Sequence, residues 1–150
     1  MLKQWLRHRL SLSIYIVVSI FIGPFYSNMV LFIVPTKASL LRLCASIAFY
    51  ALPYFLFAFF LLSISKIPAE KANLQVFSNT ALISFILAVV LLTYFVAFTV
   101  SSWNLPSSNA VTFSAMQQFL SGWGFGFLSG LCVLAAGYFF VGKKVNALKV

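Results

Sequence analysis

Residues 80–100 read TALISFILAVVLLTYFVAFTV, a stretch with neither a charge nor a proline. A membrane hydrocarbon core of about 30 Å requires roughly 20 apolar residues at a helical rise of about 1.5 Å per residue. A surface helix of a soluble bundle needs a polar face to present to water, and this stretch has no charged side chain to form one. The stretch is therefore predicted to be a transmembrane helix.

Three further stretches meet the same requirement, and they are residues 11–34, 40–65 and 115–141. The whole chain is 63% hydrophobic and 7% charged, whereas a soluble domain has about 45 to 50% apolar and about 25% charged residues. No Ser/Gly/Pro-rich linker or charge run divides it. The sequence predicts an all-α, polytopic integral membrane protein in which residues 1–150 form a single domain of four transmembrane helices.

The first stretch contains Gly23 and Pro24, where proline removes a backbone donor and a kink is expected. The alternative is a re-entrant hairpin that bends at these two residues and returns the chain to the side from which it came. The basic flank before the stretch resembles that of a signal peptide, but no small-residue cleavage site follows. We therefore expect a retained signal anchor.

The ten basic residues favour four complete spans over the hairpin. With four spans, eight of them share one side of the membrane and two lie on the other; with the hairpin, the split is even. Basic residues accumulate on the cytoplasmic side. The sequence thus predicts that both termini are cytoplasmic in a bacterial-type inner membrane. The formal charge of +9 is explained by basic residues that flank the membrane spans and contact lipid headgroups. No nucleic acid is expected as a partner.

Groups that perform chemistry inside membranes are scarce in this chain. It has no Asp, and its single Glu and single His, Glu70 and His8, lie in segments outside the predicted spans. Acid–base catalysis, metal binding and haem ligation all depend on such side chains. We expect no enzymatic activity, no catalytic residues, no metal site and no cofactor.

The most specific pattern is the run of Gly122, Gly126 and Gly130 in the fourth predicted span. Glycines at four-residue spacing form a groove that lets another helix approach closely. This pattern predicts a helix-packing site, whose partner helix can belong to this chain, to a second copy or to another protein. Tyr50 and Tyr54, an i, i+4 pair in the second span, are candidates for intramembrane polar contacts.

Two further residues are candidates for contacts at the membrane surface. Arg42 lies two residues inside the second span, where its side chain can extend to the interface and contact a headgroup or an external partner. Trp103 follows the third span in an uncharged loop and is expected to anchor at the interface. Asn79, just before the third span, is expected to cap that helix.

These observations lead to competing functional hypotheses. The first is a small inner-membrane interaction protein that acts through transmembrane helix contacts, either as an accessory subunit or as a protective protein of the immunity or exclusion kind. Its partners would be the lipid bilayer and another membrane protein or a second copy of itself. The alternative is a small carrier or flippase component for a lipid-linked substrate, and a pore-forming lysis protein is a third, less favoured option.

Overall fold

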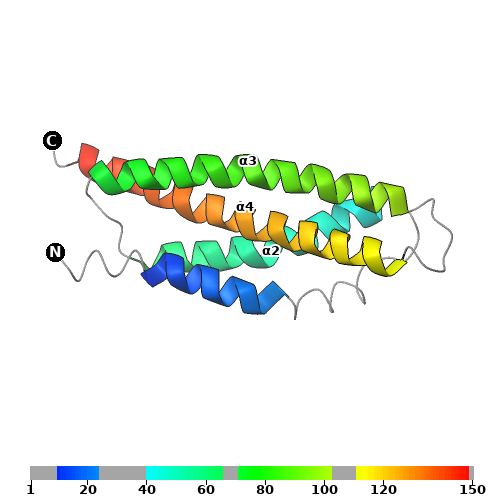
Figure 1. Ribbon diagram of the computed structural model, residues 1–150. Helices are drawn as coiled ribbons and strands as arrows, with labels where there is room; N and C mark the ends of the chain where they lie inside the picture. The colour runs from blue at the N-terminus through cyan, green and yellow to red at the C-terminus, as the bar shows by residue number, and fades with distance from the viewer. Residues whose placement is uncertain (1–9, 24–39, 66–70, 103–110, 149–150) are drawn as a thin grey trace.

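The structure is a computed structural model that describes residues 10–23, 40–65, 71–102 and 111–148, and its described elements are all helical. A first helix spans Leu10–Gly23. It is followed by α2 (Leu40–Ile64), α3 (Lys71–Ser102) and α4 (Val111–Ala147). The four helices lie along one common direction and form an elongated bundle (Figure 1).

Three of these helices are long and apolar enough to cross a membrane. The apolar segments run from Leu40 to Ile64, from Leu74 to Ser101 and from Met116 to Ala147. With 25, 32 and 37 residues, α2, α3 and α4 exceed the roughly 20 residues that a bilayer core requires. The first helix is a shorter apolar helix; the predicted first span continues to residue 34, and residues 24–34 lie outside the described part of the chain.

The helix α4 is the centre of the bundle because it packs against all the others. Its contacts with α3 and α2 account for the main helix pairings. The first helix lies along the α4 face that Phe127 and Tyr138 occupy, as Tyr15 and Ser11 hydrogen bond with these two residues. Figure 1 accordingly shows α4 between α3 on one side and the first helix and α2 on the other.

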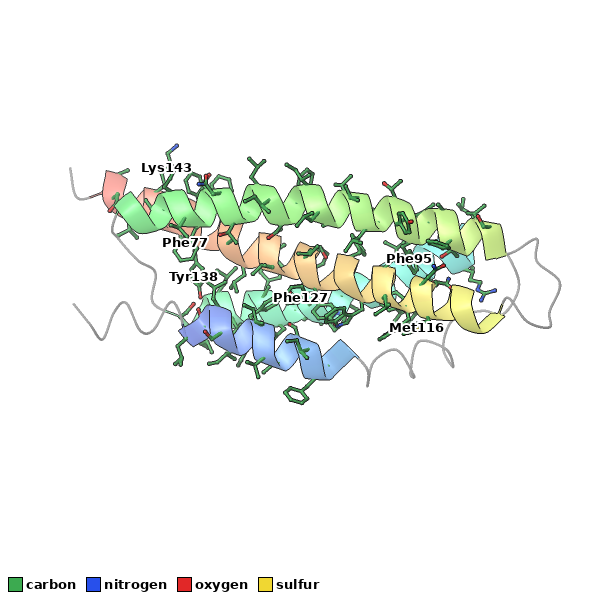
Figure 2. The ribbon with its side chains drawn as sticks, in the orientation of Figure 1. Phe77, Phe95, Met116, Phe127, Tyr138 and Lys143 are labelled. Carbon is green, nitrogen blue, oxygen red and sulfur yellow. The ribbon has the colours of Figure 1, made fainter. Side chains whose placement is uncertain are left out.

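The ends of the helices meet in two groups, which we call the Lys143 end and the Met116 end after residues labelled in Figure 2. The first helix and α3 begin at the Lys143 end, whereas α2 and α4 begin at the Met116 end (Figure 1). Leu43 near the start of α2 shares an apolar cluster with Phe119 near the start of α4. The first helix and α2 therefore begin at opposite ends of the bundle, whereas a hairpin at Gly23 and Pro24 would place the two starts at the same end.

The third helix starts much earlier than predicted. The predicted span begins at residue 80, yet α3 begins at Lys71. The segment before residue 80 contains no Gly or Pro, and its Phe77 is buried with its ring centroid 5.0 Å from that of Tyr138, so packing on α4 extends the helix. The prediction that Asn79 caps α3 is wrong, because Asn79 lies inside the helix and accepts a hydrogen bond of 3.1 Å from Gln75 Nε2.

A buried tyrosine hydroxyl joins three helices at the Lys143 end. The hydroxyl of Tyr138 in α4 hydrogen bonds with Ser11 Oγ of the first helix, and it lies 2.6 Å from Oγ of Ser65, which directly follows α2. Ser65 Oγ also donates to the Leu61 carbonyl. Helices in lipid gain little from burying apolar surface against each other, so interhelical hydrogen bonds of this kind help to specify the arrangement.

Replacing Tyr138 by Phe removes this shared hydroxyl and keeps the ring. We expect the free energy that holds the first helix on the bundle to fall by about 1 kcal/mol. Faster amide hydrogen exchange over residues 10–23 would reveal this loss. Tyr94→Phe is the matched control, since Tyr94 is an exposed tyrosine on α3. Equal exchange rates in the two variants would show that the Tyr138 hydroxyl does not hold the first helix.

Candidate functional site

The predicted packing glycines of α4, which are Gly122, Gly126 and Gly130, face aromatic residues of the same chain. A Cβ atom added at Gly122 would lie 2.8 Å from the Tyr50 ring and 3.0 Å from the Phe95 ring. One added at Gly126 would overlap with the Tyr50 carbonyl oxygen and lie 2.8 Å from the Tyr54 ring, and one at Gly130 would lie 2.8 Å from Tyr54 Cβ. The glycine groove is thus occupied by α2 within one chain.

The glycines bring the backbones of α2 and α4 together. At Gly126 the nearest atom to an added Cβ is the main-chain oxygen of Tyr50, and at Gly130 the main-chain oxygen of Tyr54 lies 2.9 Å away. Backbone atoms cannot rotate aside as a flexible side chain can. No residue other than glycine fits at Gly126 unless the two helices separate.

Gly122 serves a second purpose, because it lets α2 and α3 meet across α4. The Tyr50 and Phe95 rings have their centroids 5.4 Å apart in an edge-to-face arrangement, a geometry that aromatic pairs favour. Phe95 is fully buried, and Tyr50 is 9% exposed. Figure 2 shows Phe95 directed from α3 toward the other helices. The glycines and tyrosines, which the sequence suggested as separate features, therefore form one packing site.

Tyr15 of the first helix completes this site. Its hydroxyl donates a hydrogen bond of 2.7 Å to the Phe127 carbonyl and lies where a Cβ at Gly130 would be. Its ring stacks on Phe57 of α2 and Phe127 of α4, with centroid distances of 5.7 and 5.6 Å. Tyr15 is fully buried and contacts two helices at once.

Tyr15 is not among the residues predicted from the sequence, although a signal for it is present there. Residues Ser11, Tyr15, Ser19 and Gly23 recur at four-residue spacing, and apart from Ser13 the rest of the helix is apolar. In the structure, Ser11 and Tyr15 form hydrogen bonds to α4, and Gly23 packs against Trp123. Trp123 Nε1 also points to the Ser19 carbonyl at 3.4 Å. This polar and small stripe faces Trp123, Phe127 and Tyr138 of α4, and it meets the glycine stripe where the Tyr15 hydroxyl reaches Gly130.

Of the two residues predicted to contact the membrane surface, the structure describes only Arg42, which does not belong to this site. Arg42 is half-buried on α2, and its carbonyl accepts a hydrogen bond of 2.8 Å from Ser46 Oγ. It lies at the Met116 end, where Gln118 Nε2 of α4 donates to Thr99 Oγ1 of α3 at 2.9 Å. Trp103 lies outside the described residues.

The chemistry of the packing site consists of apolar contacts and hydroxyl groups. Within the described ranges, no three His, Cys, Asp or Glu side chains are placed to hold a metal ion. Comparison of the chain with known protein families, with characterised proteins and with solved structures finds no match. A functional proposal for this chain therefore rests on the arrangement of its helices.

Gly126→Leu tests the packing site directly. The new side chain would overlap with the Tyr50 carbonyl, so α2 and α4 would have to separate, and overpacking of this kind costs about 3 kcal/mol. Denaturant unfolding of the detergent-solubilised protein measures the loss. Ala48→Leu is the matched control because Ala48 is exposed on α2, and it should unfold like the wild type. Unchanged stability of Gly126→Leu would contradict the close approach of α2 and α4.

Proposed function

We propose that this chain is a non-enzymatic interaction protein of the membrane, which acts through contacts between its transmembrane helices and another membrane protein or a second copy of itself. It would serve as an accessory subunit or as a protective protein of the immunity or exclusion kind. The observation that carries the proposal is the two-sided character of α3. One face packs on α4, and the other is apolar and exposed along the length of the helix.

The packed face of α3 is narrow. Its buried side chains recur at helical spacing and are Phe77, Ser84, Ala88, Phe95 and Thr99. Only 17% of the most apolar part of α3 is buried inside the chain, compared with 28% for α2 and α4. Among the three long helices, α3 therefore offers the largest surface to lipid or to a partner helix.

The hydrogen bonds of the buried hydroxyl groups support a structural role for these groups rather than a catalytic one. Thr99 Oγ1 donates to the Phe95 carbonyl and Ser121 Oγ to the Gln117 carbonyl, which is the usual way in which hydroxyls are satisfied inside helices. The Tyr15 and Tyr138 hydroxyls bond across helices. The described hydroxyls thus serve hydrogen bonds within a helix or between helices.

The carrier or flippase alternative has less support. It needs a polar groove through which a substrate headgroup could pass. The glycine face of α4 is the natural lining for such a path, yet Tyr50, Tyr54 and Tyr15 occupy it. A lipid-linked substrate would have to displace these aromatic side chains from contacts that join three helices.

The proposal includes a location in a bacterial-type inner membrane with both termini in the cytoplasm. The helix arrangement places the starts of the first helix and α3 and the ends of α2 and α4 at the Lys143 end (Figure 1). Eight of the ten basic residues belong to the chain segments beside these helix ends. The excess of Lys and Arg in cytoplasmic segments supports a cytoplasmic Lys143 end.

Orientation can be tested on the intact chain with single cysteines. In a Cys44→Ala, Cys132→Ala background, Ser107→Cys should react with a membrane-impermeant maleimide in intact cells. Asn146→Cys should react only after the membrane is permeabilised. Labelling of Asn146→Cys but not of Ser107→Cys in intact cells would reverse the orientation.

The interaction proposal predicts protein contacts on α3. A photoreactive phenylalanine analogue at Ile86 or Tyr94 should form adducts with a protein in native membranes, which mass spectrometry of the purified adduct would identify. The same analogue at Phe59 of α2 is the control, because Phe59 is 60% exposed and Ile86 and Tyr94 are 53% and 57% exposed. Adducts with lipid alone at both α3 positions would overturn the proposal.

A further inference from the structure

The contact of Tyr50 with Phe95 across Gly122 is followed, one helical turn nearer the Met116 end, by three polar side chains. Residues four positions apart lie on the same face of a helix, about 6 Å apart along its axis. One such residue comes from each of the three long helices, and together we call them the outer polar layer: Ser46, Thr99 and Gln118. Figure 2 shows Phe95 and Met116 near this end of the bundle.

The three long helices remain together at the level of the outer polar layer. Gln118 Nε2 donates a hydrogen bond of 2.9 Å to Thr99 Oγ1, which joins α4 to α3. Ser46 is buried on α2, and the neighbouring Leu43 shares an apolar cluster with Phe119 of α4. The layer is therefore formed by three helices that pack on one another, and its residues are not separate points on the surface.

Arg42 lies at the outer edge of this layer. It is one turn outward from Ser46 on the same face of α2, and its carbonyl accepts the hydrogen bond from Ser46 Oγ. Its side chain is half-buried, and it is the third residue of α2, which begins at Leu40. A long basic side chain at this depth keeps its aliphatic part among apolar residues and extends its charged group to the level of the lipid headgroups.

The positive charge of Arg42 is not balanced by an acidic side chain at the Met116 end. The chain has one acidic residue, Glu70, which directly precedes the start of α3 and so belongs to the Lys143 end. With 32 residues, α3 is about 48 Å long at a rise of about 1.5 Å per residue. A guanidinium is always charged, and a charge at the edge of an apolar medium is stabilised by an anion. An anion from outside the chain can supply this balance.

The outer polar layer is open to such a molecule, unlike the polar groups at the opposite end. Tyr138, which joins three helices there, is fully buried. Arg42 and Gln118 are only half-buried, so a group from outside the chain can reach them. Leu40 and Leu41, which precede Arg42, are 73% and 71% exposed. Polar donors and exposed apolar surface therefore adjoin each other at the start of α2.

We propose that Arg42 and the outer polar layer bind the phosphate group of a phospholipid in the leaflet at the Met116 end. The Arg42 guanidinium holds two phosphate oxygens in its planar fork. Gln118 has two amide donors, of which one goes to Thr99 and the other donates to a third phosphate oxygen. The exposed leucines at the start of α2 contact an acyl chain, which a free phosphate ion lacks. This inference is independent of the proposed function, which concerns the exposed face of α3.

Native mass spectrometry of the detergent-solubilised protein, titrated with phosphatidylglycerol, tests the site. Arg42→Gln should weaken binding of the first lipid molecule about tenfold to hundredfold, because hydrogen bonds to a charged group are lost. Lys144→Gln removes an exposed base at the opposite end and is the matched control, which should change this binding by no more than about twofold. Equal binding by wild type and Arg42→Gln, or an equal loss in both variants, would overturn the proposal.

Arg42→Lys keeps the charge and the long aliphatic chain, so it provides a test that does not depend on the folding of Arg42→Gln. It should weaken lipid binding several-fold, because an ammonium group cannot hold two oxygens in a planar fork. Gln118→Leu should also weaken binding several-fold, whereas Gln117→Leu, the same change at a half-buried neighbour, should not. Binding that is unchanged in both Arg42→Lys and Gln118→Leu would overturn the proposal.

Two competition measurements identify the part of the lipid that is bound. Diacylglycerol with the same acyl chains lacks the phosphate, so it should not displace phosphatidylglycerol from the wild-type chain. Inorganic phosphate in large excess should not displace it either, because the ion lacks acyl chains. Displacement by diacylglycerol would show that the acyl chains alone determine binding, and displacement by phosphate would show a site for the free ion. Either result would overturn the assignment to a phospholipid.

Discussion

The close approach of α2 and α4 is the constraint on which the rest of the structure depends. At Gly126 the α4 backbone lies directly against the Tyr50 carbonyl of α2. In lipid, where burial of apolar surface between helices contributes little, association relies on dense van der Waals contact and hydrogen bonding. Glycine permits this density because it lets the backbones touch. The Tyr50 and Tyr54 side chains then fill the space beside the glycines and reach the neighbouring helices.

Tyrosine is suited to this position because each ring joins a large apolar face to one polar group. Tyr50 extends over Gly122 to Phe95 of α3, and Tyr15 extends over Gly130 to the Phe127 carbonyl. A partner for a hydroxyl in an apolar interior is strongly favoured, since an unsatisfied polar group there costs several kcal/mol. A tyrosine hydroxyl therefore restricts a helix to arrangements that supply an acceptor. This requirement explains why Ser11 and Ser65 both lie at Tyr138.

The sequence predicted the all-helical class and the three long apolar helices because length and composition alone determine whether a segment can cross a membrane. It also marked Gly122, Gly126 and Gly130 as a packing surface. It could not name the partner helix, because four-residue spacing describes one surface and carries no information about which surface faces it. The early start of α3 was missed for a related reason. Hydropathy falls before residue 80, and the helix is extended by the burial of Phe77 against Tyr138, a contact between residues far apart in the chain.

The contrast between α4 and α3 connects internal packing with the proposed partner contact. In α4 the small residues let helix backbones meet. These contacts form only when aromatic side chains from other helices of the same chain enter the glycine groove. They therefore form as the single chain folds. In α3 the outward residues include Leu82, Phe85, Ile86 and Tyr94, and such large side chains keep a neighbouring backbone at a distance. Under the proposed function, the glycine face therefore serves the fold and the exposed face of α3 serves association, so substitutions in the first should affect stability and those in the second should affect association.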